Sequence, residues 1–324
     1  MMTEYVSENA SLLRKINLVF RFSYTLPFFV ASLCGVLFAL SYDPPTYVAV
    51  LIPTIVLILA VFVNFSNDYF DHGSGVDMMR FETLKEETTD DEGLKKLYWE
   101  GNQFDTGMVS ENQGKVIMAV LAVIAVVMAV PVILYGGWGV VFFGTIGLFI
   151  TYFYTAPPIN FGGRGMGELV VGISFFMMVF CSFYVLTGTY TLEIILFSLM
   201  VGIIVGLMRT VDSMSAQEAH IKNHEMSISV YLGIDGTIPV IKAVVIIAYV
   251  IAVCMIYFNL LYVLLLLTIP LMVKAWALMN EKKSRWEFKV IPYFFGLSLF
   301  TEILFMVTIG MTALIGGPIV MLSF

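Results

Sequence analysis

Long apolar segments constrain this sequence more than any other feature. A transmembrane helix needs about 20 predominantly apolar residues to cross the hydrocarbon layer of a bilayer, and nine segments of the 324-residue chain approach that length. They are Leu18–Leu40, Tyr47–Phe65, Val116–Leu134, Gly139–Tyr154, Leu169–Leu186, Leu192–Met208, Ile238–Tyr257, Leu260–Met279 and Val290–Ile309. The first is too long for the core of a signal peptide. We therefore expect a single all-α domain over residues 1–324, a polytopic membrane protein built as a bundle of nine transmembrane helices.

The composition supports this class of protein. Hydrophobic residues make up 59% of the chain and charged residues 13%, with a mean hydropathy of +0.91, whereas soluble domains carry about 25% charged residues. The net charge of −7 argues against a nucleic-acid partner, because neutralising phosphates requires a basic surface. Cys34, Cys181 and Cys254 lie in apolar runs and are expected to pack as small hydrophobic residues. The tail Met311–Phe324 is interrupted by two glycines and a proline, so we expect an interfacial extension rather than a tenth span.

The basic residues are confined to alternate connections. All 17 Lys and Arg residues lie in the N-terminal segment, the connection 67–115, the stretch around Arg164, the stretch 209–242 and residues 274–289. Cytoplasmic loops carry the excess of Lys and Arg in membrane proteins. The N-terminus, the long loop 67–115 and the motif loop 209–237 are therefore expected in the cytoplasm, and the odd number of spans places the C-terminus outside the cell membrane.

The other ionisable groups follow the same asymmetry. All three histidines belong to the cytoplasmic set, and the acidic residues of the opposite connections are Asp43 and Glu193. A channel or transporter usually places polar groups along a route that reaches both faces. In this sequence Glu302 is the one strong candidate for an ionisable group near the middle of a span. The pattern therefore predicts a polar site at a cytoplasmic mouth.

An acidic cluster follows the second span. On a helix, Asn67 and Asp71 are four residues apart and Asp68 and Asp71 three apart, so the three side chains share a face and can converge on a hard cation. Asp77 could join them after the glycine-rich turn that follows. The alternative interpretation is a helix end whose carboxylates are simply hydrated.

A second polar cluster follows the sixth span, and Asp212 is its predicted metal ligand. Asp212, Glu218 and His220 cannot share one face of a regular helix at about 100° per residue. The segment should therefore contain a break, or each group should have its own partner. For Glu218 and His220 two interpretations stay open, contact with substrate and hydration in a loop.

Two carboxylate clusters at a membrane mouth suggest a substrate that carries a diphosphate. Bare carboxylates would repel a diphosphate, and magnesium ions remove the conflict because each binds one or two carboxylates and keeps other positions for phosphate oxygens. Basic side chains near the same mouth could also bind phosphate oxygens, although each alone could be an interfacial anchor. These residues are Arg21, Arg80, Arg164, Arg209 and Lys222.

The two clusters resemble those of the UbiA superfamily of intramembrane aromatic prenyltransferases, and the resemblance covers nearly the whole chain. The first motif of that family is Asn-Asp-x-x-Asp-x-x-x-Asp. Here Asn67, Asp68 and Asp71 match, Gly75 occupies the last position, and Asp77 follows two residues later. This variant is similar to the menaquinone branch, the 1,4-dihydroxy-2-naphthoate polyprenyltransferases.

A third segment resembles the same branch. Residues 154–158 read Tyr-Thr-Ala-Pro-Pro and residues 165–168 read Gly-Met-Gly-Glu, which is similar to a loop of those enzymes. The prolines end the fourth helix and the glycines let the loop lie close to the mouth. A structural hinge is the alternative interpretation. The resemblance adds Tyr154, Arg164 and Glu168 to the candidate site.

The sequence departs from the family in two places. The second family motif is Asp-x-x-x-Asp followed by Gly-Lys, whereas this chain has Ala216, and Glu225 stands near the expected lysine. The Asn-x-Pro-x-Arg-Pro element of other branches is missing as well. The long loop instead carries a charged stretch, Glu82–Glu92, which we expect to be a mobile, solvated insertion without a catalytic role.

The resemblance implies a magnesium-dependent prenyltransferase with two metal ions and no obligate protein partner. An allylic polyprenyl diphosphate would lose its diphosphate, and the ring of a small aromatic acceptor would attack the resulting cation in a water-poor chamber open to lipid. Asp68, Asp71 and Asp212 would be catalytic, and these three and Asn67 would hold the metal. The implied substrate contacts are Arg21, Asn67, Asp77, Arg80, Tyr154, Arg164, Glu168, Arg209, Glu218, His220 and Lys222.

Two other functions remain open. Another member of the superfamily could use a different acceptor, such as a glycerol-phosphate lipid or a phenazine-like ring. A transporter or a magnesium-binding membrane protein without transferase activity is disfavoured, because the outer connections contain no basic residues.

Overall fold

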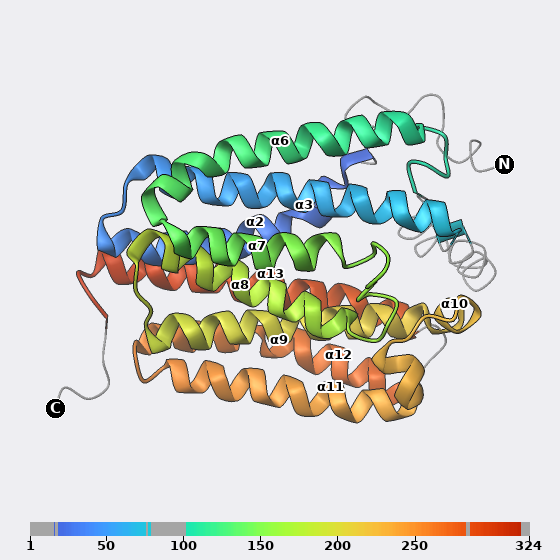
Figure 1. Ribbon diagram of the computed structural model, residues 1–324. Coiled ribbons are helices and arrows are strands. Elements are labelled where there is room, and N and C mark those ends of the chain that lie inside the picture. The colour runs from blue at the N-terminus through green and yellow to red at the C-terminus, as the bar shows by residue number, and fades with distance from the viewer. Residues whose placement is uncertain (1–15, 17–18, 76, 79–101, 283–285, 319–324) are drawn as a thin grey trace.

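The computed structural model describes residues 16, 19–75, 77–78, 102–282 and 286–318, and these residues form a bundle of helices (Figure 1). In chain order the elements are α2 (Phe22–Ala39), η2 (Leu40–Tyr42), α3 (Thr46–Ser74), α6 (Glu111–Gly136), α7 (Trp138–Tyr152), α8 (Gly167–Thr187), α9 (Leu192–Ser215), α10 (Gln217–Lys222), α11 (Ile228–Met255), η3 (Leu260–Thr268), α12 (Ile269–Glu281) and α13 (Trp286–Leu314). Within the described ranges there is no β-strand, and the one β-bridge joins Arg164 to Met226. The all-α prediction is confirmed.

Eight described helical segments are long and apolar enough to cross a bilayer. The ninth apolar helix, α7, has 15 residues and is shorter than a full span. The nine predicted segments therefore correspond to eight candidate spans and one short apolar helix. The predicted count of nine is therefore approximate, because a hydropathy window detects apolar character without fixing the length of the helix.

The polar connections are more helical than predicted. The segment 209–237, expected to be a loop, contains the end of α9, the whole of α10 and the first turns of α11. α11 begins at Ile228, ten residues before the predicted span, and bends at Gly233, where φ is 70° and ψ is 165°. The eighth predicted span begins as the 3₁₀ helix η3. The helices thus extend beyond the predicted apolar segments, because the backbone hydrogen bonds of a helix can continue through polar residues.

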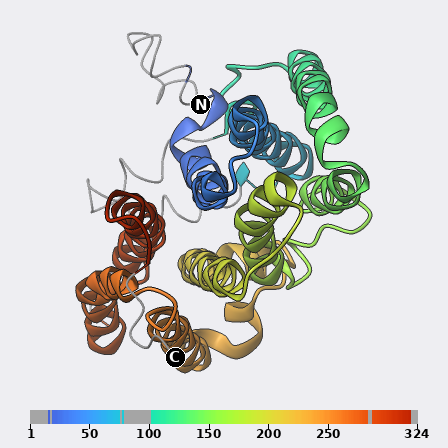
Figure 2. The same ribbon diagram turned by 90° about the vertical axis from the view of Figure 1, so that its left-hand side faces the viewer.

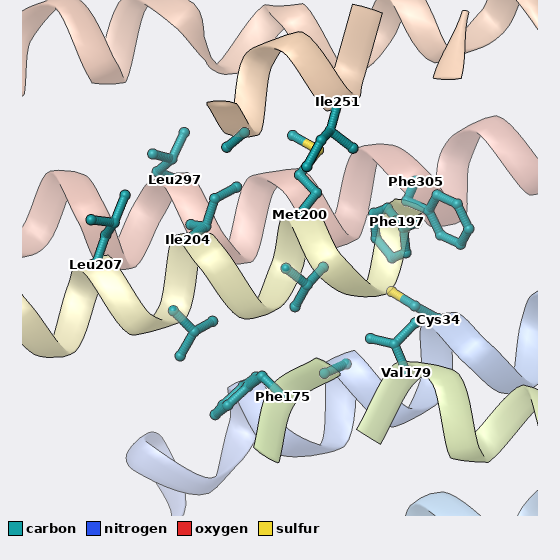
Figure 3. Packing of buried hydrophobic residues seen from close by; sticks show 14 of the residues in the cluster. Cys34, Phe175, Val179, Phe197, Met200, Ile204, Leu207, Ile251, Leu297 and Phe305 are labelled. Carbon is teal, nitrogen blue, oxygen red and sulfur yellow. The ribbon is translucent and has the colours of Figure 1, made fainter. Parts of the chain in front are cut away.

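α9 is the central helix of the bundle. It packs against α8, α11 and α13, and 67% of its apolar window is buried, compared with 11% for the peripheral helix α6. Figure 2 shows the helices end-on, and contacts of α2 with α3, α8 and α13 connect the two halves of the chain. The large apolar core runs along α9 and includes Phe197, Met200 and Ile204 (Figure 3).

Close helix contacts depend on glycine at two interfaces, between α8 and α9 and between α2 and α8. A Cβ atom on Gly202 of α9 would lie 2.6 Å from the carbonyl oxygen of Gly172 in α8, and one on Gly206 would lie 3.1 Å from that of Glu168. A Cβ on Gly35 of α2 would lie 2.1 Å from the Val179 carbonyl oxygen. Backbones can approach this closely only without a side chain, which is the usual role of small residues in membrane helix packing.

We expect Gly35→Ala to destabilise the protein, because the Cβ atom would overlap the Val179 carbonyl oxygen and force α2 away from α8. Overpacking of this kind costs about 1–3 kcal/mol. Gly144→Ala is the matched control, since a Cβ at this position in α7 meets no atom within 4 Å and alanine favours helix by up to about 1 kcal/mol. Thermal unfolding of the purified variants measures the difference, and equal melting temperatures would contradict the close contact.

Candidate active site

The two acidic motifs lie at the same end of the bundle, where α3 and α9 terminate and α6 begins (Figure 1). We call this the motif end. α3 runs to Ser74, so Asn67, Asp68 and Asp71 lie on its last two turns, as predicted. Gly75, with φ 76°, ends the helix and donates its N–H to the carbonyl oxygens of Asp71 and His72. The chain can therefore turn sharply directly after the motif.

Asp68 is the most enclosed carboxylate of the first motif. The residue is 3% exposed, and its Oδ1 lies 3.1 Å from Arg21 Nη1. Its Oδ2 is buried and has no hydrogen-bond partner in the part of the chain that the structure describes. Arg21 precedes α2 in the left-handed conformation, with φ 48°. Because a buried carboxylate is costly unless it is paired, the open oxygen marks a place for a cation.

A segment that sequence reasoning missed covers this carboxylate. Asn102 is 2% exposed, and its Nδ2 donates to the backbone oxygen of Asp68 and to Oδ2 of Asp77, each at 2.7 Å. The Asn102 Oδ1 accepts from the N–H of Phe104 at 2.8 Å. Asn102 therefore uses both amide hydrogens and its oxygen to fix Asp77 beside Asp68. The bridge places Asp77 near Asp68, and its participation in substrate binding stays a prediction.

The residues after Asn102 continue the cover. Asp105 pairs through Oδ1 with Nδ1 of His72, which lies one turn beyond Asp68 on α3. Phe104 packs edge-on against Phe65, with ring centroids 5.3 Å apart, and stacks beside His72. In the sequence this stretch is part of a long polar loop. The one local pattern that marked a helix nearby was the capping box formed by Ser110 and Gln113 at the start of α6.

The second motif is organised around Arg209. Its guanidinium pairs with the carboxylate of Asp212, three residues later on α9, and its Nε donates to the hydroxyl of Tyr154 at 3.2 Å. The Asp212 side chain is 47% exposed, whereas that of Arg209 is 22% exposed. Asp212 thus stays accessible at the mouth, although an arginine already neutralises part of its charge.

The loop between α7 and α8 joins the two motifs. Thr155 donates its hydroxyl to Oδ1 of Asn67 at 2.8 Å, and the preceding Tyr154 accepts from Arg209. Two consecutive residues therefore connect the end of α3 to the end of α9. This arrangement explains why the Tyr-Thr-Ala-Pro-Pro segment accompanies the acidic motifs, and it gives Tyr154 a place at the predicted site.

Glu168 lies inside the protein rather than at an open mouth. It is 5% exposed, and its Oε1 accepts from the hydroxyl of Ser213 at 3.2 Å and from the N–H of Ile228 at 3.1 Å. These bonds tie the start of α8 to the end of α9 and the start of α11. The structure thus shows Glu168 as a link among three helices beside the second motif.

Five other predicted site residues are less closely connected with the two motifs. His220 is 2% exposed and pairs with Oε2 of Glu225 at 2.6 Å, which is the separate partner that the second cluster required. Glu218, Lys222 and Arg164 are exposed. Arg80 lies outside the described residues, as does the insertion Glu82–Glu92.

Comparison with known proteins decides the family. Residues 28–300 match the family described as the UbiA prenyltransferase family. The chain belongs to this family. A curated relative, the 1,4-dihydroxy-2-naphthoate octaprenyltransferase of Bacillus subtilis (strain 168), is 26% identical over 130 residues. That match spans 39% of this chain and 41% of the relative. The protein is therefore a multi-pass membrane protein of the UbiA prenyltransferase family.

Solved structures show the same UbiA fold. A UbiA homolog from Archaeoglobus fulgidus bound to GPP and Mg2+ has a TM-score of 0.65 and 12% sequence identity, and the match covers 92% of this chain and 99% of that one. A digeranylgeranylglyceryl phosphate synthase has a TM-score of 0.62 and 14% identity, with 92% and 98% covered. At these identities the likeness establishes the architecture of the bundle.

The first motif of this UbiA protein suits a divalent cation. The buried Oδ2 of Asp68 lacks a partner among the described residues, and Asn67 and Asp71 provide further oxygen atoms on the same turns of α3. Oxygen donors are the ligands that Mg²⁺ prefers. Across the described ranges, no three Asp, Glu, His or Cys side chains are grouped closely enough to hold a metal. A cation bound here would therefore need oxygens from a ligand or from water as well.

We expect Asn102→Asp to lower prenyl-transfer activity, since the new carboxylate cannot donate to the Asp68 carbonyl and would repel Asp77. Changes to residues that orient metal ligands typically cost about 10- to 100-fold in metal affinity or activity. Turnover measured against Mg²⁺ concentration should show the loss. Asn112→Asp, an exposed position on α6, controls for the added charge. Equal activity in the two variants would contradict the bridging role of Asn102.

Proposed function

We propose that this UbiA-family enzyme transfers a polyprenyl group from an allylic polyprenyl diphosphate to 1,4-dihydroxy-2-naphthoate, with Mg²⁺ as cofactor, in menaquinone biosynthesis. The observation that carries the metal-diphosphate part is the unpartnered, buried Oδ2 of Asp68 in the first acidic motif, which Thr155 and Tyr154 link to the second. The similarity to the Bacillus enzyme supports the acceptor. The position of Asp77, two residues after Gly75, supports the same branch.

In this proposal Asn67, Asp68, Asp71 and Asp212 hold two magnesium ions. When bound, magnesium supplies positive charge to the leaving diphosphate, where charge develops in the transition state. The protein supplies the fixed geometry, because Asn102 orients the Asp68–Asp77 pair and Tyr154 orients Arg209. The ligands then need little rearrangement during the reaction.

Two arginines are the best-placed phosphate contacts. A guanidinium carries five N–H donors, and Arg209 uses its Nε on Tyr154 and its Nη1 on Asp212, which leaves others for a diphosphate. Arg21 lies beside Asp68 at the start of α2. Arg80, Arg164 and Lys222 stay in the proposal as outer contacts, together with Glu218 and His220.

The apolar bundle next to the site suits a carbocation and a long isoprenoid tail. Bond cleavage leaves the electron pair on the departing diphosphate, and a ring carbon of the acceptor then forms the new bond to the allylic carbon. The attacked ring carbon releases its proton, or its carboxylate as CO2, and the electrons of the broken bond restore the aromatic ring. Water would capture the cation, so its exclusion by a packed apolar interior protects the reaction. The apolar core along α9 extends from Arg209 into the bundle, with Leu207, Val205 and Ile204 buried. We further propose that the motif end faces the cytoplasm and that the C-terminus lies outside.

A glycerol-phosphate lipid is the second candidate acceptor. The structural neighbour described as a digeranylgeranylglyceryl phosphate synthase favours it, because that protein shares the fold over nearly its whole length. Its 14% identity supports the architecture and leaves the acceptor to be decided by experiment.

Purified protein in lipid nanodiscs, given a radiolabelled polyprenyl diphosphate, Mg²⁺ and a panel of acceptors, should prenylate 1,4-dihydroxy-2-naphthoate. The panel includes a glyceryl phosphate lipid and a phenazine carboxylate, and the products are separated by chromatography. Product with the glyceryl phosphate and none with the naphthoate would overturn the proposed acceptor while keeping the reaction class.

Asp68→Asn should reduce turnover by at least about 100-fold, because a carboxylate that holds magnesium beside the leaving diphosphate is lost. The variant keeps the side-chain volume, so its thermal unfolding should stay close to that of the wild type. Asp235→Asn is the matched control, since this carboxylate is 86% exposed and pairs with Lys282. Full activity of the Asp68 variant would refute the metal assignment.

A further inference from the structure

Three polar side chains in the middle of α13 are buried without a partner. Glu302 and Thr301 are 0% exposed and Ser298 is 4% exposed. In the described part of the chain, both carboxylate oxygens of Glu302 and the hydroxyls of Ser298 and Thr301 lack any hydrogen bond. The other buried side-chain nitrogen and oxygen atoms without a hydrogen bond belong to residues at the motif end or within one helical turn of it. These residues are Asn64, Asp68, Gln103, Asp105, His220 and Asn223.

The two hydroxyls differ from the other buried hydroxyls of the spans. A serine or threonine inside a helix usually donates to the carbonyl oxygen four residues earlier. This bond is present at Ser174, Ser182, Thr187, Ser198, Thr210, Thr237 and Thr308. Thr308 lies on α13 itself, so the helix permits the bond. Ser298 and Thr301 thus keep their hydroxyl groups available to a bound species.

The three side chains share one face of the helix. Ser298 and Glu302 are four residues apart, and Ser298 and Thr301 are three apart, so they lie side by side. Neighbouring helices enclose them. Cys34 of α2 donates its thiol to the Glu302 carbonyl oxygen at 3.5 Å, and one turn beyond Glu302 the ring of Phe305 stacks on Phe197 of α9, with centroids 3.5 Å apart (Figure 3).

The charge of Glu302 determines which kind of ion this group of side chains can bind. No described Lys, Arg or His forms an ion pair with Glu302, and an uncompensated carboxylate in the hydrocarbon region is costly. The available groups are all oxygens, which bind hard cations. One carboxylate balances one positive charge, so a monovalent ion gives a neutral site, whereas a divalent ion would leave excess charge in a low-dielectric interior.

We propose that Glu302, Ser298 and Thr301 form a buried sodium-binding site that stabilises the bundle. It lies on α13, near the middle of the 29-residue helix, whereas the acidic motifs lie at the ends of α3 and α9. Bound sodium neutralises Glu302 and satisfies the two hydroxyl oxygens together. The site is independent of the proposed prenyl transfer, and its role is structural.

Thermal unfolding of the full chain in detergent tests the proposal. At constant ionic strength, replacing choline chloride by sodium chloride should raise the melting temperature of the wild type, by about 5 °C when sodium is about 100 times its Kd. Glu302→Gln keeps the side-chain volume and removes the charge, so this variant should lose the sodium-dependent rise. Ser298→Ala should shift the rise to higher sodium concentrations. Radioactive sodium should bind to the wild type at one ion per chain and fail to bind to Glu302→Gln.

Two controls make the result specific. Ser198→Ala removes a buried hydroxyl that already donates to Ile194, so it should keep the full sodium-dependent rise even if its starting stability falls. Asp68→Asn should also keep it, which separates this site from the catalytic metal. The same response to choline and sodium, or an unchanged rise in Glu302→Gln, would overturn the proposal. A melting temperature that rises on acidification and not on addition of sodium would also overturn it, and would show that the Glu302 carboxyl is protonated and beside trapped water.

Discussion

The low dielectric of the hydrocarbon layer determines how this protein distributes its polar groups. Each backbone N–H and C=O within the layer needs an internal partner, so the described spans are helices. The same requirement explains why hydroxyls inside the spans donate to their own helix, as Ser198 and Thr210 do. Groups that must meet a charged ligand can then collect only where the helices emerge. The ends of α3 and α9 provide that place, and Asp68 lies just deep enough to be buried there.

The candidate site is assembled by short bridges between helix ends. Tyr154 and Thr155 connect Arg209 on α9 with Asn67 on α3, and Asn102 connects Asp68 with Asp77. Each bridge uses a neutral donor or acceptor, so it positions the charged groups without neutralising them. This matters for a metal-diphosphate site, because ligands that were fully paired within the protein would have no affinity left for a cation. α9 adds rigidity, since it is packed on several sides by other helices.

The sequence was informative where a short-range pattern carries the signal. Helix spacing predicted that Asn67, Asp68 and Asp71 share the end of one helix, and hydropathy located the spans to within a few residues at most ends. Asn102 and Asp105 were missed because their role depends on contacts across 25 to 34 residues, and nothing in the local pattern marks them. The glycines show the same limit of reasoning from sequence alone. Gly172 and Gly202 allow close helix packing, whereas Gly144 and Gly147 face open space. The residues alone do not reveal which face of a helix meets a neighbour.

Family membership constrains the two ends of the substrate unequally. Under the proposed function, the diphosphate end needs oxygen ligands and arginines at fixed spacing, and a short motif such as Asn67, Asp68 and Asp71 can carry that requirement. The acceptor needs a cavity of the right shape next to the allylic carbon, and shape depends on side-chain volumes scattered over several helices. Relatives that share the fold can therefore differ in their acceptors, because discrimination between rings and glycerol lipids would depend on side-chain packing rather than on the acidic motifs.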